Sequence, residues 1–165
     1  MYIFEELRKE HDNLREFTNT LEALAITFME SNEISFGEFY NAIEYIKDYA
    51  DKKHHQKEEE ILFKGLLETG DELVNNIINH AMIVEHNLAR MYVWELENAI
   101  RQYEEEASVK LKLSIITNTM SYVYLLRKHI DKENNVLYPY GEKLLSAEDI
   151  ENMDIKAKEF DKSFN

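Results

Sequence analysis

The chain has 165 residues, a formal net charge of −14 and no cysteine. This length suits one compact domain, and the negative charge disfavours binding to nucleic acid or to an anionic membrane surface. The lack of cysteine excludes disulfides, thiolate zinc sites, iron–sulfur clusters and cysteine nucleophiles, so any bound metal has only nitrogen and oxygen ligands.

Apolar residues recur at helical spacing along most of the chain, which contains only four Gly and one Pro, and this pattern predicts long helices. Ser35 opens a Ser-x-x-Glu capping box, Ser108 is a further N-cap candidate, and Gly70 is typical of a helix C-terminus. Pro139 is expected to mark the end of the fourth helix. The four predicted long helices cover about residues 3–28, 35–67, 71–104 and 108–139, and a short fifth helix is predicted over about 146–160.

Connections of about 4–6 residues place neighbouring helices antiparallel. The expected fold is therefore all-α: an up-down-up-down four-helix bundle over residues 1–143, built from two tandem helical hairpins, with a short C-terminal helix and tail over residues 144–165. Aromatic residues at helical spacing are interpreted mostly as core. The inner face expected for the fourth helix contains Leu111, Ile115, Tyr122, Leu125, Val136 and Leu137.

The most informative feature of the sequence is an internal repeat. The segment from His54 reads His-x-x-Lys-Glu-x-x-x-Leu-aromatic, and the segment from His129 repeats this pattern 75 residues later, so that Glu58 corresponds to Glu133. Each half therefore supplies a His-x-x-x-Glu motif on its second helix and one further His on its first. The other pairs that keep the same step are Glu10 and Glu85, His11 and His86, and Arg15 and Arg90.

The repeated residues are predicted to converge. Because residues i and i+4 lie on one face of a helix, His54 and Glu58 can present a nitrogen and a carboxylate to one centre. The two legs of the first hairpin, from His11 to the turn and back to His54, are each about 19 residues long, so both histidines reach the same level. The second hairpin repeats this arrangement. The six groups expected to meet near one end of the bundle are His11, His54, Glu58, His86, His129 and Glu133.

Such a cluster favours a metal site, because carboxylates and imidazoles facing an apolar core are costly to bury without a cation. Two divalent metals bridged by Glu58 and Glu133, each with two His ligands, leave room for an oxo or hydroxo bridge and an exogenous ligand. A single His-x-x-x-Glu pair is more often a surface contact. Its recurrence with a partner His at one offset favours the metal site over that interpretation, while the spacing alone leaves the metal open among iron, zinc, copper and nickel.

Other residues receive structural interpretations. His55, whose repeat counterpart is Ile130, is expected to pack against the site or contact a ligand residue, with a role as a metal ligand as the lesser alternative, and His80 is expected on the surface. Tyr122, two turns before His129, is interpreted as core, with a gating or redox role as the alternative. The repeated basic residues expected to form ion pairs with neighbouring carboxylates are Arg15, Lys57, Arg90 and Lys132.

At these residues the chain resembles the hemerythrin-like, HHE cation-binding family over about residues 1–143. The resemblance implies a four-helix bundle with a non-haem di-iron centre and both glutamates as bridges. In oxygen carriers of this family, a further His lies four residues before the His that corresponds to His86, where this chain has Met82. Their second carboxylate is an Asp five residues after the His that corresponds to His129, whereas this chain has Glu133 four residues after it. These departures argue against reversible oxygen transport. The resemblance carries metal-ligand roles onto His11, His54, Glu58, His86, His129 and Glu133.

The expected function is therefore that of a di-iron protein that binds or senses a small diatomic ligand, O2 or NO. One alternative is a di-iron enzyme, an oxidase, peroxidase or NO reductase, that uses the same ligands with an open iron position. Further alternatives are iron buffering and a structural or partner-binding bundle. No catalytic residue besides the metal ligands is assigned.

The N-terminal residues are acidic where a signal peptide would be basic and then apolar, and no stretch approaches the ~20 consecutive apolar residues of a membrane span. The expected location is the cytoplasm, without nucleic acid or membrane partners. The sequence leaves formation of a homodimer open.

Overall fold

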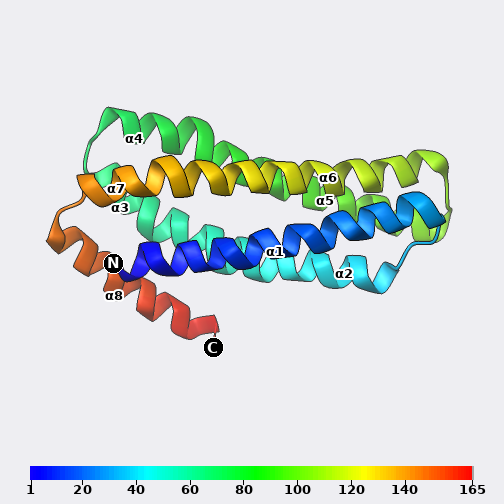
Figure 1. Ribbon diagram of the computed structural model, residues 1–165, viewed down its shortest axis with the longest axis horizontal. Helices are drawn as coiled ribbons and strands as arrows, with labels where there is room; N and C mark the ends of the chain where they lie inside the picture. The colour runs from blue at the N-terminus through cyan, green and yellow to red at the C-terminus, as the bar shows by residue number, and fades with distance from the viewer. Residues whose placement is uncertain (165) are drawn as a thin grey trace.

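The computed structural model describes residues 1–164 and confirms an all-helical bundle of four long helical segments with a short fifth helix (Figure 1). The first segment is α1 (Tyr2–Ser31), and the second consists of α2 (Phe36–Tyr45), the π-helical turns η1 (Ile46–His55) and η2 (Glu58–Phe63), and α3 (Lys64–Glu68). The third contains α4 (Glu72–Ile77), π-helical η3 (Ile78–Met82) and α5 (Ile83–Glu105). The fourth contains α6 (Val109–Lys132), π-helical η4 (Glu133–Leu137) and α7 (Tyr138–Leu144), and α8 (Ala147–Asp161) and a 3₁₀ turn, η5 (Lys162–Phe164), follow.

Two helix starts lie where the cap residues predict them, since α2 begins directly after Ser35 and α6 directly after Ser108. The Ser108 hydroxyl accepts a hydrogen bond from the backbone N–H of Leu111, as an N-cap does. The predicted capping box at Ser35 is wrong, because this residue precedes α2 without making a side-chain cap hydrogen bond. Its backbone has a ψ of 86°, whereas Ser108, which does cap its helix, has an extended ψ of 155°.

The prediction that Pro139 ends the fourth helix is also wrong. Pro139 lies in the first turn of α7, which continues to Leu144. Pro139 directly follows the π-helical turn η4, and the change of hydrogen-bond pattern there accommodates a residue without a backbone N–H. The preceding π-helical turn η4 is wider than an α-turn and changes which residues face inward, so Val136, expected on the inner face, is 52% exposed.

The apolar core consists of two clusters. One cluster runs along the bundle and contains the buried apolar residues of α1 from Leu14 to Phe28 together with their partners on α2, α5 and α6. The other lies at the end that contains the start of α1, the η2–α3 turn, η3, η4 and α8. Between them lies a layer of buried polar residues contributed by all four long segments. Among residues 1–164, none of the helices combines the length and apolar character needed to cross a bilayer.

Helix α8 packs beside the start of α1 (Figure 1). The carboxylate of Asp154 accepts hydrogen bonds from the backbone N–H groups of Tyr2 and Ile3 at 3.0 and 2.9 Å, and α1 has no side-chain cap of its own. Met153 lies directly over Gly65, where any Cβ would collide with its side chain. The fifth helix therefore completes the N-terminus of the first and closes this end of the bundle.

Candidate metal centre

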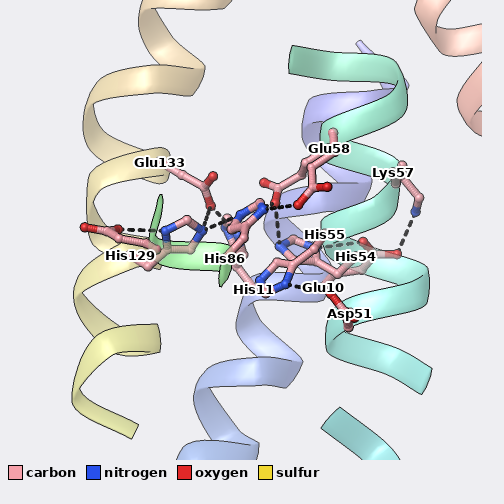
Figure 2. Close-up of polar contacts among 12 residues, drawn as sticks. Glu10, His11, Asp51, His54, His55, Lys57, Glu58, His86, His129 and Glu133 are labelled. Atoms are coloured by element: carbon pink, nitrogen blue, oxygen red, sulfur yellow. Dashed lines mark hydrogen bonds and ion pairs between the residues drawn. The ribbon is translucent and has the colours of Figure 1, made fainter. Parts of the chain in front are cut away.

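The buried polar layer contains all six residues predicted from the repeat. Figure 2 shows their side chains directed toward one another from the four long segments. Each is at most 2% exposed, although polar groups are normally found at the surface. The elements that carry them are α1 for His11, η1 for His54, η2 for Glu58, α5 for His86, α6 for His129 and η4 for Glu133.

Donor atoms of the layer form two groups, each small enough to surround one metal ion. The first group combines His11, His54, Glu58 and Glu133, whose donor atoms lie within 4.8 Å of one another. In this group Nε2 of His11 lies 3.2 Å from Oε2 of Glu133, and Nε2 of His54 lies 3.6 Å from Oε2 of Glu58. Two nitrogens and two carboxylates therefore face one point.

The second group combines His55, Glu58, His86 and His129 within the same limit. The Nε2 atoms of His86 and His129 lie 3.0 Å apart, and Oε2 of Glu58 lies 3.4 Å from the former. Glu58 belongs to both groups. Oε2 of Glu133 also lies 3.2 Å from Nε2 of both His11 and His129, one from each group. Both carboxylates are thus placed between the two groups.

The layer fits a metal because its donor atoms lack other partners. The buried atoms without a hydrogen-bond partner include Nε2 of His54, Oε2 of Glu58 and both carboxylate oxygens of Glu133. Leaving a buried polar atom unpaired is costly, and several such atoms converging on one point are rarely found in a purely structural core. Imidazole nitrogen and carboxylate oxygen together suit divalent transition metals.

Each of the four histidines related by the repeat has a hydrogen-bond partner at Nδ1 that lies outside the donor groups. Glu10 contacts His54 at 3.0 Å, and its counterpart Glu85 contacts His129 at 2.9 Å. The remaining contacts join Asn134 to His11 at 2.9 Å and Glu59 to His86 at 2.6 Å. A partner at Nδ1 fixes the ring orientation and leaves Nε2 for a metal. Sequence reasoning missed Glu59 and Asn134, although they too are 75 residues apart.

The pKa values of the two carboxylates in the layer are shifted in opposite directions. Burial and the nearby Glu133 raise the pKa of Glu58. Burial alone would raise the pKa of Glu133, but contacts with His129 and His11 hold it well below its ordinary value. Burial also keeps the pKa of His54 well below 6.5, so this imidazole is neutral. Ionised carboxylates and neutral imidazoles are the forms that bind metals.

His55 has a larger role in the site than the sequence indicated. It stacks on His86 with ring centroids 3.9 Å apart, as the packing interpretation expected, and it also supplies a donor atom to the second group. The expected position of His55 holds for regular α-helical turns, whereas His54 and His55 both lie in the π-helical η1. A π-helical turn reduces the angle between neighbouring side chains, which lets consecutive histidines face inward. His80 is exposed, as expected.

Tyr138 is a residue of the site that the sequence analysis did not single out. Its hydroxyl donates a hydrogen bond to Glu58, and its ring stacks on His11 with centroids 5.4 Å apart. The counterpart in the first half, Phe63, stacks on His86 but has no hydroxyl. The aromatic position that ends the repeated motif was the available signal.

The repeated basic residues form ion pairs with carboxylates, as predicted. Lys57 contacts Glu10 at 2.7 Å and also pairs with Asp161 of α8. Lys132 pairs with Glu85, the counterpart of Glu10. The arginine pairs join Arg15 to Asp131, and Arg90 to Asp51 and Glu59. Tyr122 is buried in the core, as predicted.

Comparison with known protein families identifies the family of the chain. A sequence model of the family described as the hemerythrin HHE cation binding domain matches residues 2–141. The match spans α1 through most of α7 and contains all residues of both donor groups. No curated protein matches the chain.

Proposed function

Because the chain belongs to the hemerythrin HHE cation-binding family, we propose that it holds two iron ions in an up-down-up-down bundle and uses them to bind or sense a small diatomic ligand, O2 or NO. The observation that carries this proposal is the pair of buried donor groups that share Glu58. Two adjoining groups with a common carboxylate suit two metal ions rather than one.

The proposed ligands are the six residues predicted from the repeat, with His55 in addition. His11 and His54 would hold one iron, and His55, His86 and His129 would hold the other, with the carboxylates of Glu58 and Glu133 between the two groups. The two positions would then be unequal, because one group offers two nitrogen donors and the other three. When bound, iron would supply the redox chemistry and the affinity for O2 or NO.

Residues around the proposed ligands support the proposal, because they orient the histidine rings and place a hydroxyl proton on Glu58. Glu10, Glu59, Glu85 and Asn134 fix the four histidine rings that follow the repeat. Tyr138 donates to one oxygen of Glu58 and leaves the other, Oε2, free of hydrogen bonds. Both core clusters border the layer and exclude water from it.

A di-iron oxidoreductase acting on O2, peroxide or NO is the second candidate. The observation that favours it is the Tyr138 hydroxyl, a proton source that is fully buried beside both donor groups. Burial and the adjacent Glu133 and Glu58 carboxylates raise the pKa of Tyr138 well above its ordinary value, so the hydroxyl keeps its proton at neutral pH.

Elemental analysis of protein purified without oxygen tests the proposal. The expected result is about two irons per chain, with a visible spectrum that changes on addition of O2 or NO. Glu58→Ala is expected to lose iron, whereas Glu60→Ala, an exposed glutamate on the same turn, is expected to retain it. Zinc in place of iron, or equal iron in both variants, would contradict the proposal. Repeated turnover of peroxide or NO would favour the oxidoreductase.

A further inference from the structure

A cavity of about 220 Å³ lies beside the second donor group. It is formed between η1, α5 and α6, and its wall is mostly apolar. The buried part of the wall contains Ile46, His55, Val93 and Tyr122, together with the small side chain of Ala89. Trp94, which is 61% exposed, lies at its outer side. A cavity of roughly 150 Å³ with an apolar lining already holds a benzene molecule.

The repeat explains why there is space at this position. The counterpart of Ala89 is Leu14, which is fully buried, and the counterpart of His55 is Ile130. On that side of the bundle Arg127 reaches from α6 to α1 and donates to Thr18, Asn19 and Glu22. These three correspond to the wall residues Val93, Trp94 and Glu97.

At the position that corresponds to Arg127, no arginine reaches across this cavity. The counterpart of Arg127 is Lys52, which is exposed and pairs with Asp48 on its own helix. Together, Ala89 in place of a leucine and Lys52 in place of a bridging arginine leave a volume that the other half of the molecule fills with its own side chains.

Polar groups in the wall indicate what kind of molecule fits. The charged residues are paired with one another, Lys47 with Glu97 at 2.6 Å and Arg90 with Asp51 at 2.8 Å. A charged ligand therefore finds no free counter-ion. The hydroxyl of Tyr122, by contrast, is buried and has no hydrogen-bond partner. A ligand with one hydroxyl group would satisfy such an atom.

We infer that this cavity is a binding site for a small uncharged organic molecule with an apolar body and one hydroxyl group, of about the size of phenol. The ligand lies against His55 and Tyr122, with its apolar body between Ala89 and Val93. This inference goes beyond the proposed function, because it concerns an organic molecule and a cavity that lies beside the donor layer.

Binding of phenol to the metal-free full-length chain tests the inference. Equilibrium dialysis measures how much phenol binds, and the fluorescence of Trp94, the single tryptophan, reports whether it binds in this cavity. The expected result is saturable binding of one phenol with a matching fluorescence change, and no binding of benzoate, which has the same ring but a charge. Absence of saturable phenol binding would overturn the inference.

Two variants locate the site. Ala89→Leu introduces the residue that the other half has at the equivalent position, and it is expected to weaken phenol binding at least about tenfold by filling the cavity. Ala42→Leu, the same change at a buried alanine that is not part of the cavity wall, is the control and is expected to leave binding unchanged. Circular dichroism checks that both variants are folded, and Val93→Phe provides a second way to fill the space. Equal effects of Ala89→Leu and Ala42→Leu would contradict the assignment.

The role of the hydroxyl is tested separately. Tyr122→Phe is expected to weaken phenol binding by about three- to tenfold and to leave benzene binding unchanged, as loss of one hydrogen bond would. Identical phenol binding in the variant and the parent would contradict the contact with Tyr122. Because all these measurements use metal-free protein, they can succeed even if iron binding fails, and the reverse also holds.

Discussion

The two halves of the molecule place the same Glu, His and Lys in different surroundings. In the first half Glu10, His54 and Lys57 are almost fully buried, and α8 covers them with Asp161. In the second half Glu85 and Lys132 make the equivalent contacts, but the Lys132 side chain is 44% exposed. The repeated motif is identical, and a segment outside the repeat creates the difference.

The comparison shows that one motif can have two energetic roles. An exposed ion pair such as Lys132 with Glu85 contributes little to stability, because water screens it. A buried lysine between two carboxylates is different, since removing it leaves charges without compensation inside the protein. The first half therefore depends on its lysine for folding, whereas the second does not.

The largest expected difference between the halves is in stability. Lys57→Ala is expected to lower the free energy of unfolding by about 3–5 kcal/mol, because Glu10 and Asp161 lose their buried cation. Lys132→Ala is the matched control and is expected to change it by less than about 1 kcal/mol. Urea unfolding of the metal-free proteins measures both values. Similar losses in the two variants would show that burial under α8 is not the cause.

A second expectation concerns pH, again in metal-free protein. Burial alone would lower the pKa of His129, but Glu133 and the hydrogen bond with Glu85 outweigh it and raise the pKa to about 10. Burial holds the pKa of His54 well below 6.5. Imidazole NMR signals are therefore expected to titrate on opposite sides of neutrality. Titration of both rings together near pH 6.5 would contradict this expectation.

The same shifts have opposite effects on folding. The stabilisation from protonated His129 is complete below its unfolded pKa of about 6.5 and is lost as the pH rises toward 10. For His54 the unfolded chain takes up a proton more readily, so stability falls as the pH drops below about 6.5. Urea unfolding between pH 7 and pH 10 is expected to show a loss in the parent that is smaller in His129→Asn.

A third expectation compares the outer partners of the two histidines. Glu10→Gln and Glu85→Gln are each expected to weaken metal binding by about 10- to 100-fold, because each removes a carboxylate that orients a ligand ring. Only Glu10→Gln is also expected to destabilise the metal-free protein, since only this glutamate pairs with a buried lysine. Competition with a chelator measures affinity, and Glu95→Gln, an exposed change on α5, is the control.

The smallest expected effect tests how α8 is attached. Asp154→Ala removes the acceptor for two amides at the start of α1 and is expected to cost about 1 kcal/mol of unfolding free energy. Glu151→Ala, an exposed change on the same helix, is expected to cost less than half of that. An equal cost in both variants would mean that the cap contributes nothing measurable.

Much of this arrangement could be predicted from the sequence because a repeat carries spatial information. One offset was enough to bring six polar residues to one level, and helical spacing located all four long segments. The inward position of His55 could not be predicted, because the pattern of apolar residues does not distinguish π-helical from α-helical turns. The burial of Lys57 escaped prediction for another reason: it depends on where α8 packs, and no repeat counterpart indicates that position.

The cap that Asp154 provides also sets an order of events during synthesis. Ile3 precedes Asp154 by 151 residues, so a nascent chain exposes the amides of its first turn until nearly the whole polypeptide has been translated. The donor set itself is complete earlier, once Glu133 has emerged. The donor residues therefore all precede Asp161 in the chain, and the pairing of Lys57 behind Glu10 and His54 requires α8 in addition to the four long segments.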